Sequence, residues 1–133
     1  MAGETNLALL LRNMRPHLNP GEYVFCCVAD QALLLGTPVL GSFQEPEGLT
    51  VILAREQADA LGLLYDYVAA WITLTVHSDL AAVGLTAAFA TALGKAGISC
   101  NVIAGYHHDH LFVASADAER AMAALQQLAE QAE

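Results

Sequence analysis

Positive charge is scarce in this chain of 133 residues, which has 5 Lys and Arg against 14 Asp and Glu and a formal net charge of -9. Nucleic acids and anionic membrane surfaces are bound through basic surfaces, so neither is expected as a partner. Charged residues make up only 14% of the sequence and hydrophobic residues 56%. This composition excludes disorder and predicts a folded domain with a sizeable core.

Cysteine is also rare, and two of the three cysteines are adjacent, at Cys26 and Cys27. They do not make a disulfide framework, and no signal-peptide pattern is visible, so we expect a cytoplasmic protein. The mean hydropathy is positive, at +0.44. Even so, the longest charge-free stretch, residues 80–94, is shorter than a membrane span, and no membrane segment is expected.

The clearest secondary-structure signals begin with residues 71–77, where apolar and polar side chains alternate. This alternation predicts a strand with one buried face. Ser78 and Asp79 are N-cap residue types, and the Ala- and Leu-rich residues after them have helical spacing up to Gly97. We therefore expect a helix that begins between residues 79 and 82 and is closed by this glycine.

Two strands and a second helix are expected in the rest of the chain. The strands are predicted at 98–104 and 110–114, on either side of a polar turn, and the helix at 116–132, where apolar residues form one stripe. The order is then strand, helix, strand, strand, helix. It predicts an α+β fold of the ferredoxin-like kind, with helices on one face of a mostly antiparallel sheet.

The first half of the chain predicts a similar order of elements. Expected in turn are a helix before Pro16, strands at 23–29, 39–44 and 49–54, and a short helix at 55–61. On this interpretation the first half lacks an opening strand and carries a hairpin insertion at 30–48, and the second half lacks a closing strand. We expect two modules, residues 1–69 and 70–133, with the boundary near residues 68 to 70.

Several segments resemble a bacterial family of small ACT-like proteins. They are Glu47-Gly48-Leu49-Thr50, the strand and its continuation at 71–78, residues 82–88 and residues 97–110. The resemblance covers about residues 18 to 128 and implies tandem ACT-like βαββαβ modules. These modules are similar to those of the animal cytosolic arginine sensor and, more remotely, to regulatory domains of amino-acid biosynthetic enzymes. The resemblance further implies an amino-acid ligand bound where two modules meet, a homodimer, no catalytic reaction and no cofactor.

The opening of the helix after residue 77 is the expected ligand site. A helix N-terminus presents unpaired N–H groups that suit a carboxylate, and Gly84 lets the backbone approach a ligand closely. Asn101 can donate and accept hydrogen bonds, and Asp109 can pair with an ammonium group. The expected ligand-binding residues are Ser78, Asp79, Val83, Gly84, Leu85, Thr86, Asn101, Ile103 and Asp109. Capping, close packing and turn formation are purely structural alternatives for several of them.

The segment His107-His108-Asp109-His110 supports a competing hypothesis. In an extended segment His108 and His110 point the same way, and with Asp109 or His77 they form a possible site for zinc or another borderline metal. No second pair at a ligand spacing accompanies them, so a solvated hairpin turn is the simpler interpretation and no metal is predicted.

The sequence thus leaves functions of different classes open. The preferred one is a non-catalytic module that binds or senses an amino acid and changes its own assembly or the state of a partner. The alternative is a protein-interaction scaffold with no ligand. A small His/Asp metal-binding protein is a weaker third hypothesis.

Overall fold

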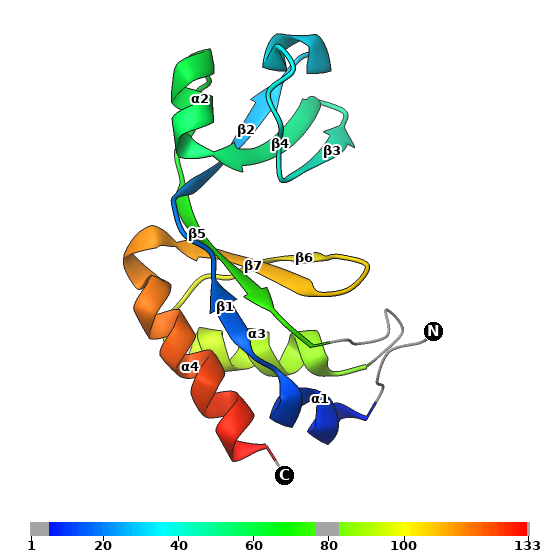
Figure 1. Ribbon diagram of the computed structural model, residues 1–133, viewed down its shortest axis with the longest axis vertical. Coiled ribbons are helices and arrows are strands. Elements are labelled where there is room, and N and C mark those ends of the chain that lie inside the picture. The colour runs from blue at the N-terminus through cyan, green and yellow to red at the C-terminus, as the bar shows by residue number, and fades with distance from the viewer. Residues whose placement is uncertain (1–5, 77–82, 133) are drawn as a thin grey trace. The chain divides into compact units, whose positions relative to one another are not determined.

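A computed structural model of the chain describes residues 6–76 and 83–132 (Figure 1). Contacts divide the chain into two compact units: unit 1 comprises residues 1–19 and 70–133, and unit 2 comprises residues 20–69. Each unit has an apolar core of its own. The sequence-based division assigned residues 1–19 to the N-terminal module, whereas their contacts group them with the C-terminal half.

Unit 1 has a sheet in the strand order β1-β5-β7-β6. Its elements are α1 (Leu7–Asn13), β1 (Pro16–Leu18), all but the first two residues of β5 (Val68–Leu74), α3 (Leu85–Lys95), β6 (Asn101–Ala104), β7 (Asp109–Ala114), the 3-10 helix η2 (Ser115–Asp117) and α4 (Ala118–Gln131). β1 runs antiparallel to β5, and β6 antiparallel to β7. This order is that of a ferredoxin-like sheet. The closing strand that the second half was expected to lack is β1, from the N-terminal part of the chain.

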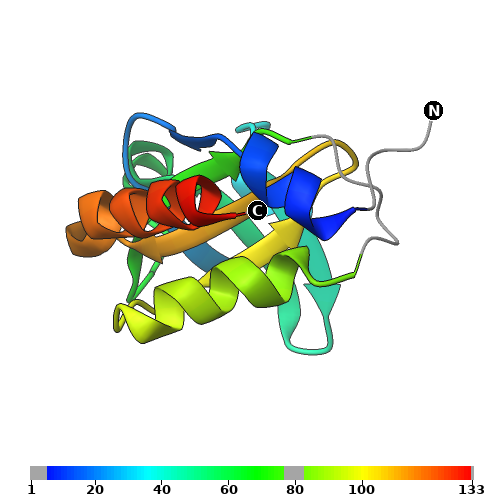
Figure 2. The same cartoon turned by 90° about the horizontal axis from the view of Figure 1, so that it is seen from below.

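Helices α1, α3 and α4 cover one face of the unit 1 sheet, as Figure 2 shows from below. Apolar side chains from both layers are fully buried between them: Leu10, Met14, Ile72, Leu74, Phe89, Leu93, Leu111, Val113 and Leu125. Burial of this apolar surface is the main stabilising contribution to unit 1. Among the described residues no helix is long and apolar enough to cross a membrane.

The C-terminus of α3 agrees with the sequence-based prediction, whereas its N-terminus does not. Gly97 has a φ of 75° and closes the helix, and the N–H of Ile98 donates to the carbonyl of Leu93 at 2.9 Å, which confirms the predicted C-terminus. The predicted start between residues 79 and 82 is wrong. α3 begins at Leu85, because Gly84 before it has a φ of 99°, a left-handed conformation that a helix cannot contain.

Unit 2 has a sheet in the order β3-β4-β2-β5. Its elements are β2 (Tyr23–Val28), the 3-10 helix η1 (Gln31–Leu34), β3 (Gly41–Glu45), β4 (Gly48–Ala54), α2 (Arg55–Leu61) and the first two residues of β5. β4 pairs antiparallel with both β2 and β3. The buried core residues are Val24, Cys26, Val28, Leu34, Val51, Leu53 and Ala58.

The opening strand of unit 2 is β2, which differs from the expectation that the first half lacks such a strand. The expected insertion at 30–48 likewise holds regular elements, since β3 is the second strand of this sheet and η1 occupies the place of its first helix. η1 is short because Leu35, with a φ of 52°, and Gly36, with a φ of 77°, take left-handed conformations directly after it. The ferredoxin-like α+β fold class is confirmed in both units.

Candidate functional site

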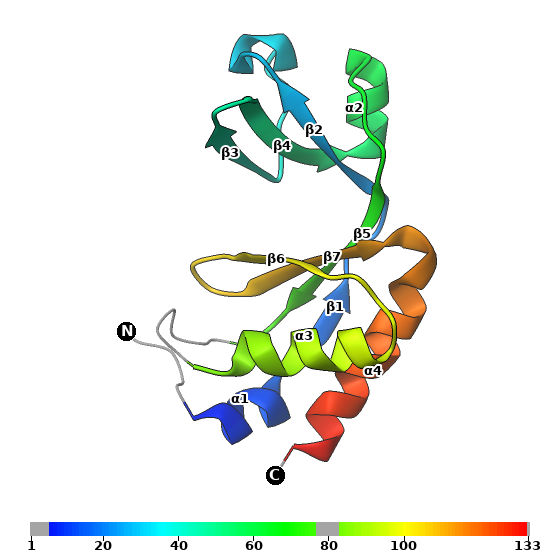
Figure 3. The same ribbon diagram turned by 180° about the vertical axis from the view of Figure 1, so that it is seen from behind.

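The expected ligand site is at the end of unit 1 where β5 ends and α3 begins. The tip of the β6–β7 hairpin lies at this same end (Figure 3). Gly84 occupies the N-cap position of α3, and no described side chain caps the helix. The first N–H groups of α3 therefore have no capping acceptor among the described side chains. Ser78 and Asp79 lie outside the described residues.

The expected residues around the start of α3 occupy different environments. Val83 is 83% exposed and Thr86 is exposed, whereas Leu85 is buried in the core and can offer a ligand only its backbone. Leu7 of α1 packs beside Gly84: a Cβ atom added to Gly84 would lie 3.0 Å from Cδ2 of Leu7. The left-handed backbone conformation therefore favours glycine at this position, and a larger residue would also press on the side chain of Leu7.

Asp109 lies at the same end of unit 1 and shares the helix-facing side of β7 with Leu111 and Val113, which are core residues. Its carboxylate is half-buried and makes no hydrogen bond or ion pair with any described residue. Burial raises the pKa of Asp109, and the neighbouring His110 and His108 oppose this effect. A half-buried carboxylate without a partner is suited to receive a cationic group.

Asn101 and Ile103 are not brought to this corner. In the β6–β7 register Asn101 is opposite Phe112 and Ile103 is opposite His110, so both lie on the sheet face away from the helices. The amide of Asn101 is directed to the carbonyl oxygen of Phe112, at 3.5 Å, at the end of β6 remote from the turn. Among the described site residues, the start of α3 and the carboxylate of Asp109 share one end and one side of the sheet.

A polar cluster that sequence reasoning missed lies on the helix-free face of unit 1. It comprises Asn19, Trp71, Thr73 and His110, and we call it the His110 cluster. The indole Nε1 of Trp71 donates to Nδ1 of His110 at 3.0 Å, and Oγ1 of Thr73 lies 3.2 Å from the same nitrogen. Nδ2 of Asn19 donates to Oγ1 of Thr73 at 3.0 Å. The cluster therefore connects the residue after β1 to β5, and β5 to β7.

Burial lowers the pKa of His110, and the nearby His108 acts in the same direction. Asp109, the next residue along β7, acts in the opposite direction. The sequence signal for this cluster was the row of Trp71 and Thr73 on one face of a strand. That signal did not identify His110 as their partner, because it carries no information on strand register.

The histidines near the β6–β7 turn do not converge on one point. Nδ1 of His108 lies 3.4 Å from the carbonyl oxygen of Val76, the ring of His107 stacks edge-on against Tyr106, and His110 faces Trp71. Within residues 6–76 and 83–132 no three His, Cys, Asp or Glu side chains are grouped so as to hold a metal ion. His77 lies outside the described residues.

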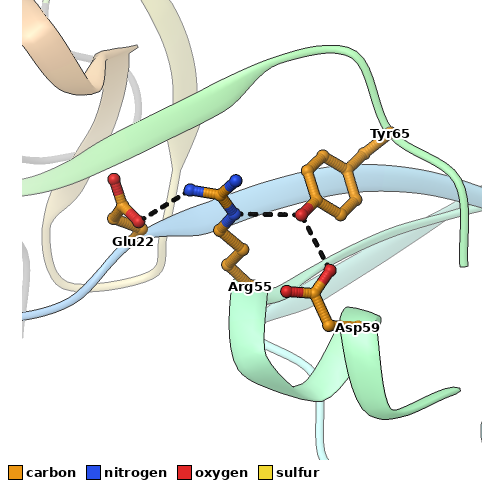
Figure 4. Close-up of polar contacts among 4 residues, drawn as sticks. All are labelled: Glu22, Arg55, Asp59 and Tyr65. Carbon is orange, nitrogen blue, oxygen red and sulfur yellow. Dashed lines mark hydrogen bonds and ion pairs between the residues drawn. The ribbon is translucent and has the colours of Figure 1, made fainter. Parts of the chain in front are cut away.

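Unit 2 carries a second polar cluster, Glu22, Arg55, Asp59 and Tyr65 (Figure 4). Nη1 of Arg55 contacts Oε1 of Glu22 at 3.0 Å, and Nε of Arg55 donates to the hydroxyl of Tyr65 at 2.9 Å. That hydroxyl donates in turn to Oδ1 of Asp59 at 2.7 Å. The hydrogen bonds to Tyr65 and Glu22 raise the pKa of Arg55.

This second cluster connects three segments of unit 2. Glu22 is the residue before β2, Arg55 and Asp59 are one turn apart on α2, and Tyr65 is in the loop after α2. The side chains of Arg55 and Glu22 are 42% and 46% exposed, so their ion pair is a surface pair of modest strength. The sequence contains one indication of this cluster. Arg55 is the first residue of a helix, where the helix dipole disfavours a positive charge. A cation at that position needs partners outside the helix, and Glu22 and Tyr65 provide them.

Two family models described as ACT domain match the chain, one over residues 2–70 and the other over residues 67–127. A Vibrio cholerae protein of unknown function, described as a possible transport protein, is 51% identical in sequence. Its crystal structure has a TM-score of 0.85 to this chain, and the match covers 92% of this chain and 95% of that one. No protein of curated function matches the sequence significantly.

Two more distant structures share the fold. The regulatory subunit of aspartate kinase from Thermus thermophilus, in its ligand-free form, is 12% identical, with a TM-score of 0.65 and coverage of 85% of this chain and 95% of that one. Aspartokinase III from E. coli, in complex with aspartate and ADP, is 13% identical, with a TM-score of 0.65 and coverage of 90% and 35%. With matches over both halves and a close relative over nearly its whole length, this chain belongs to the ACT domain family and carries two ACT domains in tandem.

Proposed function

We propose that this protein is a regulatory module without a reaction of its own, and that it binds an amino acid at the end of unit 1 where α3 begins. The observation that carries the proposal is the half-buried carboxylate of Asp109, which has no partner among the described residues. Asp109 is the first residue of β7 and lies on the helix-facing side of the sheet, and the β6–β7 turn before it is at the end of unit 1 where the uncapped α3 begins.

The two groups have complementary roles toward a zwitterion. The N–H groups at the start of α3 and the positive end of the helix dipole favour the carboxylate of a ligand. Asp109 favours its ammonium group, in a half-buried setting where such a pair is stronger than in water. Gly84 makes the left-handed turn from which α3 starts, and its lack of a Cβ makes room for Leu7 of α1. Val83, Leu85 and Thr86 would supply backbone and flanking contacts, and Ser78 and Asp79 are proposed members of the same site.

Similar proteins support a regulatory role. The chain belongs to the ACT domain family, and the distant structural neighbours include a regulatory subunit of aspartate kinase and an aspartokinase in complex with aspartate. Ligand binding would act by changing self-association, with a homodimer as the expected state, or the state of a protein partner.

A thermal-shift screen of the full chain against the twenty amino acids tests the proposal. A ligand that binds only the folded state at about 100 times its Kd stabilises it by roughly 2.7 kcal/mol. We expect a few amino acids at millimolar concentration to raise Tm. Amides of those amino acids, which lack the carboxylate, and the matching α-hydroxy acids, which lack the ammonium group, should have no effect. If none of the twenty raises Tm, the proposal fails.

A protein-interaction scaffold without a ligand is the second candidate, and a groove along α3 and α4 favours it. The groove has a volume of about 770 Å³ and is lined mainly by small or apolar side chains, among them Ala87, Ala88, Thr91, Ala92, Ala124 and Leu128. If a protein partner binds in this groove, Thr91→Glu at its exposed wall should dissociate the complex between this chain and that partner, as measured by sedimentation velocity. Amino acids should then leave the Tm of the chain unchanged. An unchanged sedimentation coefficient would count against it.

A further inference from the structure

The hydrogen bond between Trp71 and His110 fixes the protonation state of the histidine. An indole nitrogen can only donate, so Nδ1 of His110, which lies 3.0 Å from Nε1 of Trp71, must be the acceptor. The ring is therefore neutral, with its proton on Nε2. The Nε2 side is held closely by the turn, because a Cβ atom added to Gly105 would lie 3.1 Å from Nε2.

The other members of the His110 cluster extend this bond across the sheet. Thr73 is 9% exposed, and its Oγ1 accepts a hydrogen bond from Nδ2 of Asn19 and lies 3.2 Å from Nδ1 of His110. The backbone N–H of Asn19 donates to the carbonyl of Trp71 at 2.9 Å, and its Nδ2 approaches the same oxygen at 3.2 Å. The end of β1, β5 and β7 are thus joined by one chain of hydrogen bonds that ends at His110.

Protonation of Nδ1 would place two N–H groups against each other at this distance. The Trp71 N–H would lose His110 as its acceptor. The new N–H of His110 would have to share the hydroxyl oxygen of Thr73 with the side chain of Asn19, at 3.2 Å and with the indole N–H directly beside it. An unmade hydrogen bond in a half-buried site is costly, so the imidazolium is expected to leave the cluster.

We propose that the His110 cluster is a pH-dependent latch in unit 1, in which neutral His110 ties β7 to Trp71 and Thr73 of β5 and protonation at Nδ1 releases it. The latch is a property of the ligand-free chain and does not depend on the proposed amino-acid site.

The groups around His110 in unit 1 determine the direction of the response. β5 presents no charged side chain and β6 presents Ile103 opposite the ring, while exposed His17 on β1 pairs with Thr73. Burial and His108 lower the pKa of His110, and Asp109 raises it. An unfolded histidine has a pKa of about 6.5. Because the folded value is lower, the latch is fully closed above about pH 6.5, and stability falls as the pH drops from there to the folded pKa.

Trp71 is the single tryptophan of the chain, so its indole N–H gives one unambiguous NMR signal. We would follow that signal and the ring nitrogens of His110 in the full chain between about pH 4.5 and 8, which spans the histidine range. The expected result is an unprotonated Nδ1 at the upper end, and an indole shift that follows the His110 titration with a midpoint below about pH 6.5. A proton on Nδ1 at the upper end, or an indole signal that ignores the His110 titration, would overturn the latch.

Matched variants assign the titration to one histidine. His110→Gln keeps a hydrogen-bond acceptor but does not titrate, so the indole signal should lose its acid step. His17→Gln, the same change at an exposed histidine, should keep it. Trp71→Phe removes the opposed donor, so the pKa of His110 should rise toward its ordinary value, which can be measured from the histidine signals even if His110→Gln does not fold. An acid step that survives in His110→Gln, or an unchanged His110 pKa in Trp71→Phe, would refute the proposal.

Discussion

Replacing Asp109 by Asn removes one negative charge with almost no change in size. In the wild-type protein the carboxylate is half-buried without a partner among the described residues, and burial raises its pKa. Its ionised form therefore destabilises the ligand-free fold at neutral pH. We expect Asp109→Asn to raise the free energy of unfolding by about 1 kcal/mol, near the low end for an unpaired polar group because part of the side chain reaches water. For a chain of this size that corresponds to roughly 2–6 °C in Tm.

The pH dependence of this gain has a defined sign. The folded pKa of Asp109 is raised above the unfolded value of about 3.9, so the wild-type penalty is present at neutral pH and disappears as the pH falls through the folded pKa toward the unfolded one. The advantage of Asp109→Asn should disappear over the same interval, because the wild-type carboxyl group then becomes neutral.

Urea unfolding at neutral and acidic pH measures this difference, with Asp66→Asn as the control. Asp66 is exposed, so the same change of charge there should leave stability within about 0.5 kcal/mol of the wild type. In the presence of an amino acid that stabilises the wild type, Asp109→Asn should lose most of that stabilisation and Asp66→Asn should keep it. A ligand-free Asp109→Asn that is less stable than the wild type would show that the carboxylate has a stabilising partner. A full ligand response in Asp109→Asn would show that Asp109 does not bind the ammonium group.

Three further changes test the packing around the sites. Gly84→Ala introduces a Cβ at a φ of 99° and 3.0 Å from Leu7, and should lower the free energy of unfolding by about 1–2 kcal/mol in urea titrations. Tyr65→Phe keeps the ring but removes the hydroxyl that Arg55 contacts, and should cost about 0.5–1.5 kcal/mol; an equal loss in an Arg55→Met background would show that the two side chains are not coupled. Phe89→Ala empties a fully buried position and should cost about 3–5 kcal/mol by calorimetry or denaturant unfolding, and a loss below 1 kcal/mol would contradict the assigned core.

The elements with strong local signals could be predicted from the sequence. The C-terminus of α3 follows from Gly97 and Ile98, and the buried face of β5 follows from the alternation of Ile72 and Leu74 with polar residues. The start of α3 could not be predicted in the same way. The helical periodicity fits a start after the cap-type residues 78 and 79 as well as a start after Gly84. Only the left-handed backbone conformation of Gly84 shows that α3 starts after this glycine.

The candidate site was predictable only in part. Asp109 was identified from its chemistry, and the structure places it at the expected end of the sheet. Asn101 and Ile103 were chosen by the same reasoning but lie on the opposite face, because a strand sends successive side chains to opposite sides and a short strand gives too few residues to fix which side is which. His110 was grouped with its sequence neighbours in a turn, whereas its hydrogen-bond partners are on β5.

By itself the sequence determined the fold class, the order of most elements and the two-module plan, since these depend on periodicity, capping and turn residues within short windows. Tertiary structure alone decided that β1 completes the sheet of unit 1, that β2 opens the sheet of unit 2, and that His110 accepts from Trp71. These features depend on pairing between segments far apart in the chain. Such pairing depends on the competition among all possible contacts for burial and hydrogen bonds, and no local pattern records its outcome.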